Sequence, residues 1–436
     1  MPSPYIPNTD DDRRLMLERI GVASVAELFD DIPAQCRDPG LTLPPPLSEL
    51  ELQGDLSEMA ARNRPAGQMP CFLGAGAYRH FTPAVVDHII RRGEFATAYT
   101  PYQPEISQGT LQAIFEFQSL VCELTGMDVA NAGMYDGASA LAEACLMAVR
   151  IGGRRRLALL STLCPAYERV VRTYAAGHDI AVDVVGPGDI ALTDEHACLV
   201  VQQPNFFGYF EDMAALAERA RQAGALHIVV PDPVSLGMIR PPGDYGADIV
   251  VAEGQALGVP LSFGGPYVGV FACRSEHIRQ MPGRLVGRTQ DVEGRIGYVL
   301  TLQTREQHIR RERATSNICT NEQLVALAVT VYLCAMGKQG LRRVAELCYH
   351  KSHYAAERIA ALAGYSLPLA GAFFQEFVVR CPQPPGEVNA ALLERGIIGG
   401  LDVSDRIENG LLLCVTEMNS RDEIDRLVTA LKEITT

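Results

Sequence analysis

Polar residues that follow two apolar runs, 227–232 and 248–253, are the first candidates for chemistry. The run "HIVVPD" ends in Asp232, and "DIVVAE" leads through a glycine to Gln255. A carboxylate at Asp232 can pair with the protonated ring nitrogen of pyridoxal phosphate (PLP), which keeps that ring an electron sink. A carboxylate that caps the turn "DPVSLG" explains Asp232 equally well, so both readings stay open.

Two further segments carry groups suited to the same cofactor. "MYDGASALAEA" places Gly137 and Ser139 at an expected helix start, where free N–H groups and the helix dipole can bind a phosphate. A tight turn before a capped helix has the same pattern. "QQPNFFGYFED" contains Asn205, which can hydrogen-bond the 3-oxygen of PLP or only shape a turn. Each segment keeps both interpretations.

Lysine is almost absent from the chain. Of 38 basic residues, three are lysines, namely Lys338, Lys351 and Lys432. A general preference for arginine explains most of this bias. A protonated guanidinium cannot form the Schiff base that holds PLP, because it does not act as a neutral amine nucleophile. The expected helical stretch beyond the sheet contains Lys338 and Lys351, which is the wrong place for that role.

Two polar loops are candidates for contacts with another chain. The proline-punctuated loop "FATAYTPYQPEISQG" (95–109) carries Tyr99 and Tyr102, and its shape suits reaching across an interface. "RERATSNICTNEQ" clusters Ser316 and Asn317 before a long helix. That cluster is also a helix N-cap by composition.

Bulk properties exclude several classes of function. A net charge of −14 argues against nucleic acid or an anionic membrane as the main partner. The N-terminus lacks the apolar run of a signal peptide, and the apolar stretch 324–336 is too short to span a bilayer. The 12 cysteines include no CxxC pair, which favours reduced thiols in a cytoplasmic protein. His350 and His353 lack further ligands at a recognised spacing, so no metal site is predicted.

The elements that must position these residues follow from the hydrophobic pattern. Residues 1–70 form an arm of short helices, in which Ser24 and Glu27 have the spacing of a capping box. From 71 to 320, apolar runs alternate with helical patterns, which predicts a mostly parallel sheet covered on both faces. Residues 321–436 read as a long helix followed by a small α+β domain.

Several longer stretches carry a resemblance to a known family. They closely resemble the glycine cleavage system P-protein, and within it the first (α) subunit of its two-subunit form, across essentially the whole chain. The stretches are "PYIPNTDDDRRLML", "YTPYQPEISQGTLQAIFEFQS", "MYDGASALAEA", "EGQALGVPLSFGGPY" and "GYVLTLQTREQHIRRERATSNICTN".

The resemblance implies an aspartate-aminotransferase-like fold (PLP fold type I). It implies an α₂β₂ assembly in which the β subunit carries the Schiff-base lysine and PLP. Glycine is decarboxylated there, and the aminomethyl group passes to the lipoyl arm of the H-protein. Gln255 falls near the lysine's place, so this chain is expected to form no Schiff base. Gly137, Ser139, Asn205 and Asp232 would then line a degenerate pocket.

Fold type I enzymes build each site at a subunit interface, so the resemblance leaves a role for a chain without the lysine. Tyr99, Tyr102, Ser316 and Asn317 are expected to approach the β-subunit site. One alternative is a non-catalytic scaffold that stabilises β or docks the H-protein through the basic run 305–313. The segment 303–313 that contains this run is otherwise an ordinary solvated face. The other alternative, a self-sufficient PLP enzyme, would need Lys338 or Lys351.

Overall fold

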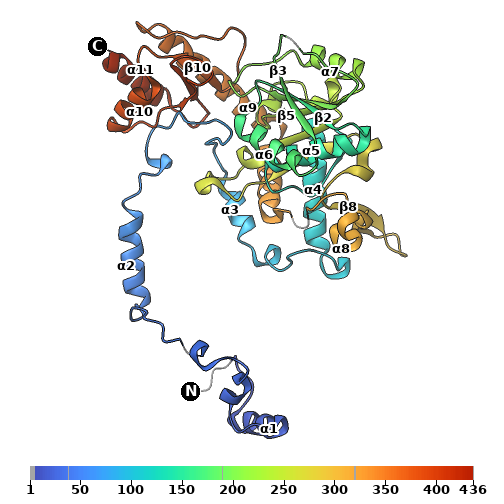
Figure 1. Ribbon diagram of the computed structural model, residues 1–436. Helices are drawn as coiled ribbons and strands as arrows, with labels where there is room; N and C mark the ends of the chain where they lie inside the picture. Colours follow the sequence, from blue (N-terminus) through green and yellow to red (C-terminus); the bar gives the residue numbers. More distant parts are fainter. Residues whose placement is uncertain (1–4, 38, 189, 319–320, 436) are drawn as a thin grey trace. The chain divides into compact units, whose positions relative to one another are not determined.

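The computed structural model describes residues 5–37, 39–188, 190–318 and 321–435. By its internal contacts the chain divides into two compact units, Met1–Arg64 and Pro65–Thr436. Figure 1 shows both units coloured along the sequence. The predicted domain boundaries at 70 and 320 stay predictions.

The N-terminal unit contains two α-helices, α1 (Asp10–Ile20) and α2 (Glu49–Ala60), with the 3₁₀ turns η1 (Val25–Phe29) and η2 (Ala34–Cys36) between them. Capping boxes formed by Thr9 and by Ser48 start the two helices. The capping box predicted at Ser24 is wrong, because neither of its two bonds forms. Glu27 accepts the N–H of Ala23 rather than that of Ser24, and the Ser24 hydroxyl donates to Glu27 at 3.1 Å and caps no backbone N–H. None of the described residues of this unit is buried, so it has no core of its own.

The second unit is built on a seven-stranded sheet with the order β1-β7-β6-β5-β4-β2-β3. The strands β2 to β6 are parallel, whereas β7 is antiparallel to both β6 and β1. Their bounds are β1 (Val129–Ala130), β2 (Arg156–Leu160), β3 (Ala181–Val185), β4 (His196–Gln203), β5 (Leu226–Pro231), β6 (Ile249–Glu253) and β7 (Gly269–Cys273). The mostly parallel sheet predicted from the continuous apolar runs is confirmed.

Helices cover both faces of this sheet (Figure 1). Along β4, Cys198 and Val200 pack into the core beneath α5 and α6, while Leu199 and Val201 pack into the core beneath α4, α7 and α9. This alternation is why a strand buried on both faces reads as an unbroken apolar run. The helices are α3 (Ala84–Ile90), α4 (Gln108–Thr125), α5 (Gly137–Gly152), α6 (Pro165–Ala176), α7 (Met213–Gln222) and α9 (Gln323–Ala360).

Two features between the sheet and the C-terminal part were not predicted. A hairpin of β8 (Leu285–Gln290) and β9 (Ile296–Thr301) precedes the short helix α8 (Gln307–Arg310). Helix α9 is interrupted at Gly337, whose φ of 60° and ψ of −179° are not helical. By length and composition α9 passes as a membrane span, but it buries Val329 and Tyr332 in the core, as a core helix does.

The C-terminal part has a three-stranded antiparallel sheet, β10-β12-β11, covered by two helices. The bounds are β10 (Glu376–Arg380), α10 (Pro385–Glu394), β11 (Leu401–Asp402), β12 (Gly410–Cys414) and α11 (Arg421–Thr435). The small α+β domain expected from sequence is confirmed. Residues 71–80 are attached to it, because Phe72 N–H binds Ile398 O and Cys414 N–H binds Phe72 O, both at 2.9 Å.

Candidate functional site

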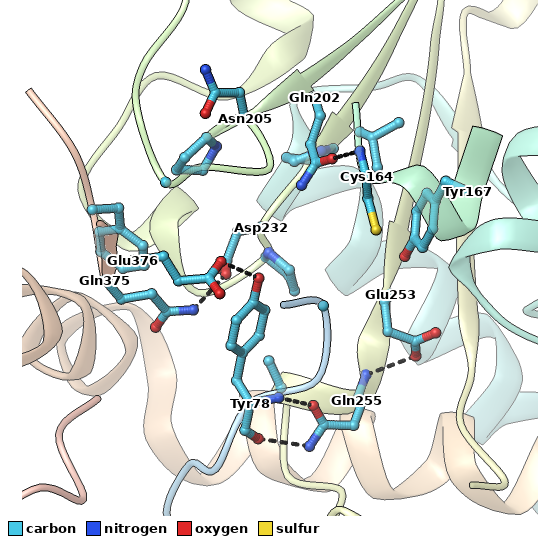
Figure 2. A pocket seen from close by; sticks show the side chains of 18 residues that line it. Tyr78, Cys164, Tyr167, Gln202, Asn205, Asp232, Glu253, Gln255, Gln375 and Glu376 are labelled. Atoms are coloured by element: carbon cyan, nitrogen blue, oxygen red, sulfur yellow. Dashed lines mark hydrogen bonds between the residues drawn. The ribbon is translucent and has the colours of Figure 1, made fainter. Parts of the chain in front are cut away.

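A cavity of about 50 Å³ lies where β4, β5 and β6 end and α6 begins. The carboxyl ends of parallel strands are where open α/β sheets bind their ligands. Typical small-molecule sites have volumes of about 300 Å³ or more, so this cavity has room for a few waters rather than a cofactor. Figure 2 shows the side chains that fill the remaining space.

Asp232 lines this cavity, as predicted, and its carboxylate is fully engaged. Oδ1 accepts the N–H groups of Val234 (2.8 Å) and Ser235 (3.0 Å), so the turn-cap reading holds. Oδ2 accepts a 2.8 Å hydrogen bond from Gln375 Nε2, which comes from the segment before β10 (Figure 2). Burial raises the pKa of Asp232, while the His80 charge and the two backbone N–H groups lower it.

Gln255 also lines the cavity and is buried, in the short turn η8 (Gly254–Ala256) after β6. Its amide is saturated by backbone partners. Oε1 accepts Tyr78 N–H at 2.8 Å, and Nε2 donates to Tyr78 O at 2.9 Å and to Val259 O at 2.8 Å. Gln255 therefore acts as a clamp that fixes Tyr78 across the cavity (Figure 2).

Glu376 is a second clamp on the same segment. Its Oε2 accepts the Tyr78 hydroxyl at 2.7 Å, and its Oε1 accepts Ala75 N–H at 2.6 Å. Burial raises the pKa of Glu376 to about 7, against the lowering effect of these two hydrogen bonds. The Tyr78 ring stands in the middle of the cavity with its hydroxyl toward Glu376 and Asp232 (Figure 2).

The predicted phosphate-binding start of α5 is occupied by a carboxylate of the chain itself. Asp136 is the N-cap and forms a capping box with Ser139. The N–H of Gly137 donates at 2.9 Å to Glu253 Oε2, and the N–H of Gln255 donates at 3.0 Å to Glu253 Oε1. Burial raises the pKa of Glu253 to about 7, and its bonds to the backbone N–H groups of Gly137 and Gln255 lower it.

Space at the same helix start is also closed. A Cβ on Gly137 would lie 2.3 Å from the Tyr167 hydroxyl and 2.9 Å from Glu253 N. A helix start that binds a phosphate needs both free N–H groups and room for the anion. Here the N–H groups of Gly137 and Ser139 are already bonded, and the room is taken by Tyr167 and Glu253.

Asn205 lines the cavity but functions as a turn residue. Its Oδ1 accepts Phe207 N–H (3.0 Å) and Tyr209 N–H (3.1 Å), and its Nδ2 donates to Glu211 Oε1 (2.8 Å). The Oδ1 atom and one of the two Nδ2 hydrogens are therefore used within this turn.

Tyr99, Tyr102, Ser316 and Asn317 do not line the cavity. The structure instead brings Tyr102 and Ser316 to a second place, beside the buried ion pair of Arg284 and Glu306 (3.6 Å). Arg284 Nη2 donates to the Tyr102 hydroxyl at 3.0 Å. Ser316 lines a small cleft with Glu306 and accepts Ile318 N–H.

Tyr99 and Asn317 are exposed beside these anchored residues in the sequence; 82% of Tyr99 is accessible. No contact within the described residues accounts for the exposed position of the Tyr99 ring.

The arginines of the basic run 305–313 differ in their surroundings. Arg305 turns inward and donates to backbone carbonyls, including Gly283 O (3.0 Å), whereas Arg310, Arg311 and Arg313 are exposed.

Neither candidate lysine reaches the cavity. Lys351 Nζ donates to Glu417 O and Asn419 O, both at 2.6 Å, and Lys338 is exposed on α9. His353 stacks on Phe373 with ring centroids 4.0 Å apart. Within the described part of the chain, His80, Cys348 and Glu417 form one group of potential metal ligands, but they hydrogen-bond one another (His80 to Glu417 at 2.7 Å).

The chain has the fold of the PLP fold type I enzymes, with a mostly parallel seven-stranded sheet. Solved structures of mouse CSAD in apo form (TM-score 0.65, 14% identity, 94% of this chain and 92% of that chain) and Lactobacillus brevis glutamate decarboxylase (TM-score 0.66, 13% identity, 94% and 96%) share the fold. At such identities the likeness concerns the fold alone.

Closer relatives define the family. The model of the glycine cleavage system P-protein family matches residues 3–431. A probable glycine dehydrogenase (decarboxylating) subunit 1 of Thermomicrobium roseum is 56% identical over 99% of both chains, and one of Desulforamulus reducens is 52% identical over 99% of both. A crystal structure of glycine decarboxylase (P-protein) of the glycine cleavage system, in inhibitor-bound form, has a TM-score of 0.92 at 44% identity and covers 99% of this chain and 100% of its own. The chain belongs to the glycine cleavage system P-protein family, and its closely similar members are subunit 1.

PLP, which the fold class implies, does not fit the residues of this cavity. No amine lines it, the anion position at α5 is occupied by Glu253, and Asp232 is bonded to Gln375. Sequence reasoning missed the residues responsible, Glu253, Tyr78 and Glu376, and also Arg284 at the second place. No local pattern marks them, because Tyr78 and Glu376 are 298 positions apart.

Proposed function

We propose that this chain is the α subunit of a two-subunit glycine decarboxylase that is inactive without its β subunit. The β subunit carries PLP on its lysine, and the two subunits form an α₂β₂ assembly in the cytoplasm. Glycine loses CO₂ at the β-subunit site, and the aminomethyl group passes to the lipoyl arm of the H-protein. The names of the relatives, "subunit 1", support a partner subunit.

One observation carries this proposal: both polar atoms of the Gln255 amide, which the resemblance puts near the place of the Schiff-base lysine, are bonded within the chain. An amide is not a nucleophile toward an aldehyde, and a lysine elsewhere cannot replace it because none lines the cavity. The chemistry therefore belongs to a second chain.

The contribution of this chain to that chemistry is a wall of the β-subunit site. Tyr99 and Asn317 are exposed, and Tyr102 and Ser316 lie next to the Arg284–Glu306 pair, which fixes their loops. Polar side chains on rigidly held loops position a ligand or cofactor phosphate with little loss of conformational entropy. These residues bind and orient; none accepts or donates a proton in this chain's own cavity.

Reconstitution tests the proposal. The purified chain with added PLP should show no borohydride-reducible label, and a mixture with β should be labelled on β alone. Glycine decarboxylation should require both subunits. A label on a lysine of this chain, or decarboxylation by a preparation free of β, contradicts the proposal.

The wall is tested by substitution in the complex. Tyr99→Phe, Tyr102→Phe, Ser316→Ala and Asn317→Ala should each lower turnover about tenfold or more while assembly is retained, because each removes a polar contact made across the interface. Tyr174→Phe, which removes a hydroxyl from α6, is the matched control and should leave turnover unchanged. Unchanged kinetics for all four variants would reject the wall.

A second function, docking of the H-protein, is favoured by the exposed Arg310, Arg311 and Arg313 in a chain of net charge −14. A basic patch facing an acidic carrier raises the association rate and makes it salt-dependent. Arg310→Gln should then raise KM for the H-protein at low salt and leave kcat unchanged. An unaltered KM excludes docking at this patch.

A further inference from the structure

We propose that the cavity of this chain is permanently filled by the chain itself, with the Tyr78 ring and the Glu253 carboxylate in the two positions that a phosphorylated aromatic cofactor would take. The inference concerns this chain alone and does not depend on which partner carries PLP. Three observations support it: one for the ring, one for the anion, and one for the clamp that holds the ring in place.

The first contact concerns the ring. Residue 255 and Asp232 are the two points between which a pyridine ring would lie, since one would bind its aldehyde and the other its nitrogen. Tyr78 fills that interval: Gln255 holds its backbone on both sides at 2.8 and 2.9 Å, and its hydroxyl reaches Glu376 at 2.7 Å beside Asp232 (Figure 2). An aromatic ring is thus already packed where the cofactor ring would stack.

The second contact concerns the anion. The start of a 16-residue helix attracts negative charge through its free N–H groups and its dipole. Glu253 places its carboxyl group there from the end of β6, with Oε2 2.9 Å from Gly137 N. Tyr167 closes the remaining space, as the crowding at Gly137 shows.

The third contact is the clamp itself. Glu376 and Gln255 come from different parts of the chain, and both bind the segment 75–78. Removing one clamp leaves the other, so the segment stays closed after a single substitution. A lysine at position 255 is therefore insufficient to restore cofactor binding.

Inorganic phosphate and the purified full chain provide the test. Glu253→Ala removes the carboxylate and leaves the Gly137 N–H free, so phosphate should raise its unfolding midpoint by about 2 °C or more at saturation. Two controls are the unsubstituted chain and Glu394→Ala, which changes an exposed glutamate of α10. In both, phosphate should raise the unfolding midpoint no more than potassium chloride of equal ionic strength does.

Each outcome decides the matter. A phosphate-dependent rise confined to Glu253→Ala supports the proposal. A rise in the unsubstituted chain means that the anion position is open. The absence of a rise both in Glu253→Ala and in Glu253→Ala combined with Tyr167→Ala, which also clears the crowding at Gly137, means that Glu253 does not occupy it. Either result overturns the proposal. Neither bears on the reconstitution experiment with β.

A separate readout addresses the ring position. Gln255→Lys with added PLP should give no Schiff-base absorbance and no borohydride-stable label, while circular dichroism shows a folded chain. A label on Lys introduced at position 255 would overturn the claim that Tyr78 excludes the cofactor. If this variant fails to fold, the phosphate experiment still decides the proposal.

Discussion

At the scale of single residues, the cavity is governed by carboxyl groups that burial makes reluctant to ionise. The pKa values of Glu253 and Glu376 are both raised to about 7, against 4.5 for an ordinary glutamate. Asp136 and Tyr167 face Glu253, and Asp232 and Tyr78 face Glu376. The chain therefore holds protons in its folded state that the unfolded chain has released at neutral pH.

This proton uptake has a defined sign. The folded pKa lies above the unfolded one, so the stabilising contribution is complete below about pH 4.5 and is lost as pH rises through about 7. Between about pH 6 and about pH 8 the unfolding free energy should fall by about 1 kcal/mol for each of the two groups. Glu253→Gln should remove about half of that slope, measured by urea unfolding across the pH range. An unchanged slope would show that Glu253 is ionised throughout.

Arg284 is a positioning residue for the predicted interface. It donates to the Tyr102 hydroxyl at 3.0 Å and lies 5.3 Å from the ring centroid. Arg284→Lys keeps the charge but loses the planar fork, so turnover of the α–β complex should fall about threefold to tenfold. The exposed Arg288→Lys is the control.

A double-mutant cycle separates positioning from general damage. Because Arg284 acts through Tyr102, the effect of Arg284→Lys should shrink in the Tyr102→Phe background. Full additivity of the two effects on kcat would mean that Arg284 acts by another route.

At the scale of elements, the site depends on how closely the turn after β4 approaches β10. Gly208 has a φ of +89°, and a Cβ there would lie 1.9 Å from Glu376 O. The same glycine N–H and carbonyl bond to Asn205 O (2.8 Å) and Phe374 N (2.9 Å). Only glycine can adopt this left-handed conformation readily and also leave room for the Glu376 carbonyl.

Gly208→Ala should accordingly destabilise the chain by at least about 2 kcal/mol, combining backbone strain with displacement of β10. The midpoint of urea unfolding measures this. Gly386→Ala, in the first turn of α10 with nothing within 4 Å, is the control and should be neutral or slightly stabilising. Equal midpoints for the two variants would contradict the close-approach argument.

At the scale of the whole molecule, the two compact units differ in how they are stabilised. The unit 65–436 has large buried cores, whereas no described residue of the unit 1–64 is buried. Apolar side chains such as Leu15, Leu50 and Leu56 are exposed on its helices. Apolar surface of this kind normally marks an interaction surface.

Removal of residues 1–64 tests that difference. The shortened chain should unfold within about 0.5 kcal/mol of the full chain, because surface segments without a core contribute little. Its affinity for the β subunit should fall, as measured by co-purification or analytical ultracentrifugation. A large loss of stability in the lone shortened chain would mean that the unit is needed for folding.

Much of this architecture could be predicted from sequence because its signals are local. The apolar runs at 227–232 and 248–253 became β5 and β6, and Asp232 and Gln255 came to line the predicted cavity. The hairpin β8–β9 was missed because the second half of β8 is polar and exposed, so no apolar run marks that strand. The occupants of the cavity could not be predicted, because Tyr78 and Glu376 meet only after the sheet and the C-terminal domain have assembled.

Residues 71–80 bond to the C-terminal sheet, so this segment cannot reach its folded position until the ribosome has synthesised the end of the chain. The backbone of Phe72 bonds to Ile398 and Cys414, and the Asn419 side chain donates to the Cys71 carbonyl. Those partners are synthesised last, so this early segment stays without them through almost all of translation. A nascent chain of this kind exposes an unfinished, partly apolar surface for longer than one built from local contacts, and we expect it to depend on chaperones that protect such surfaces.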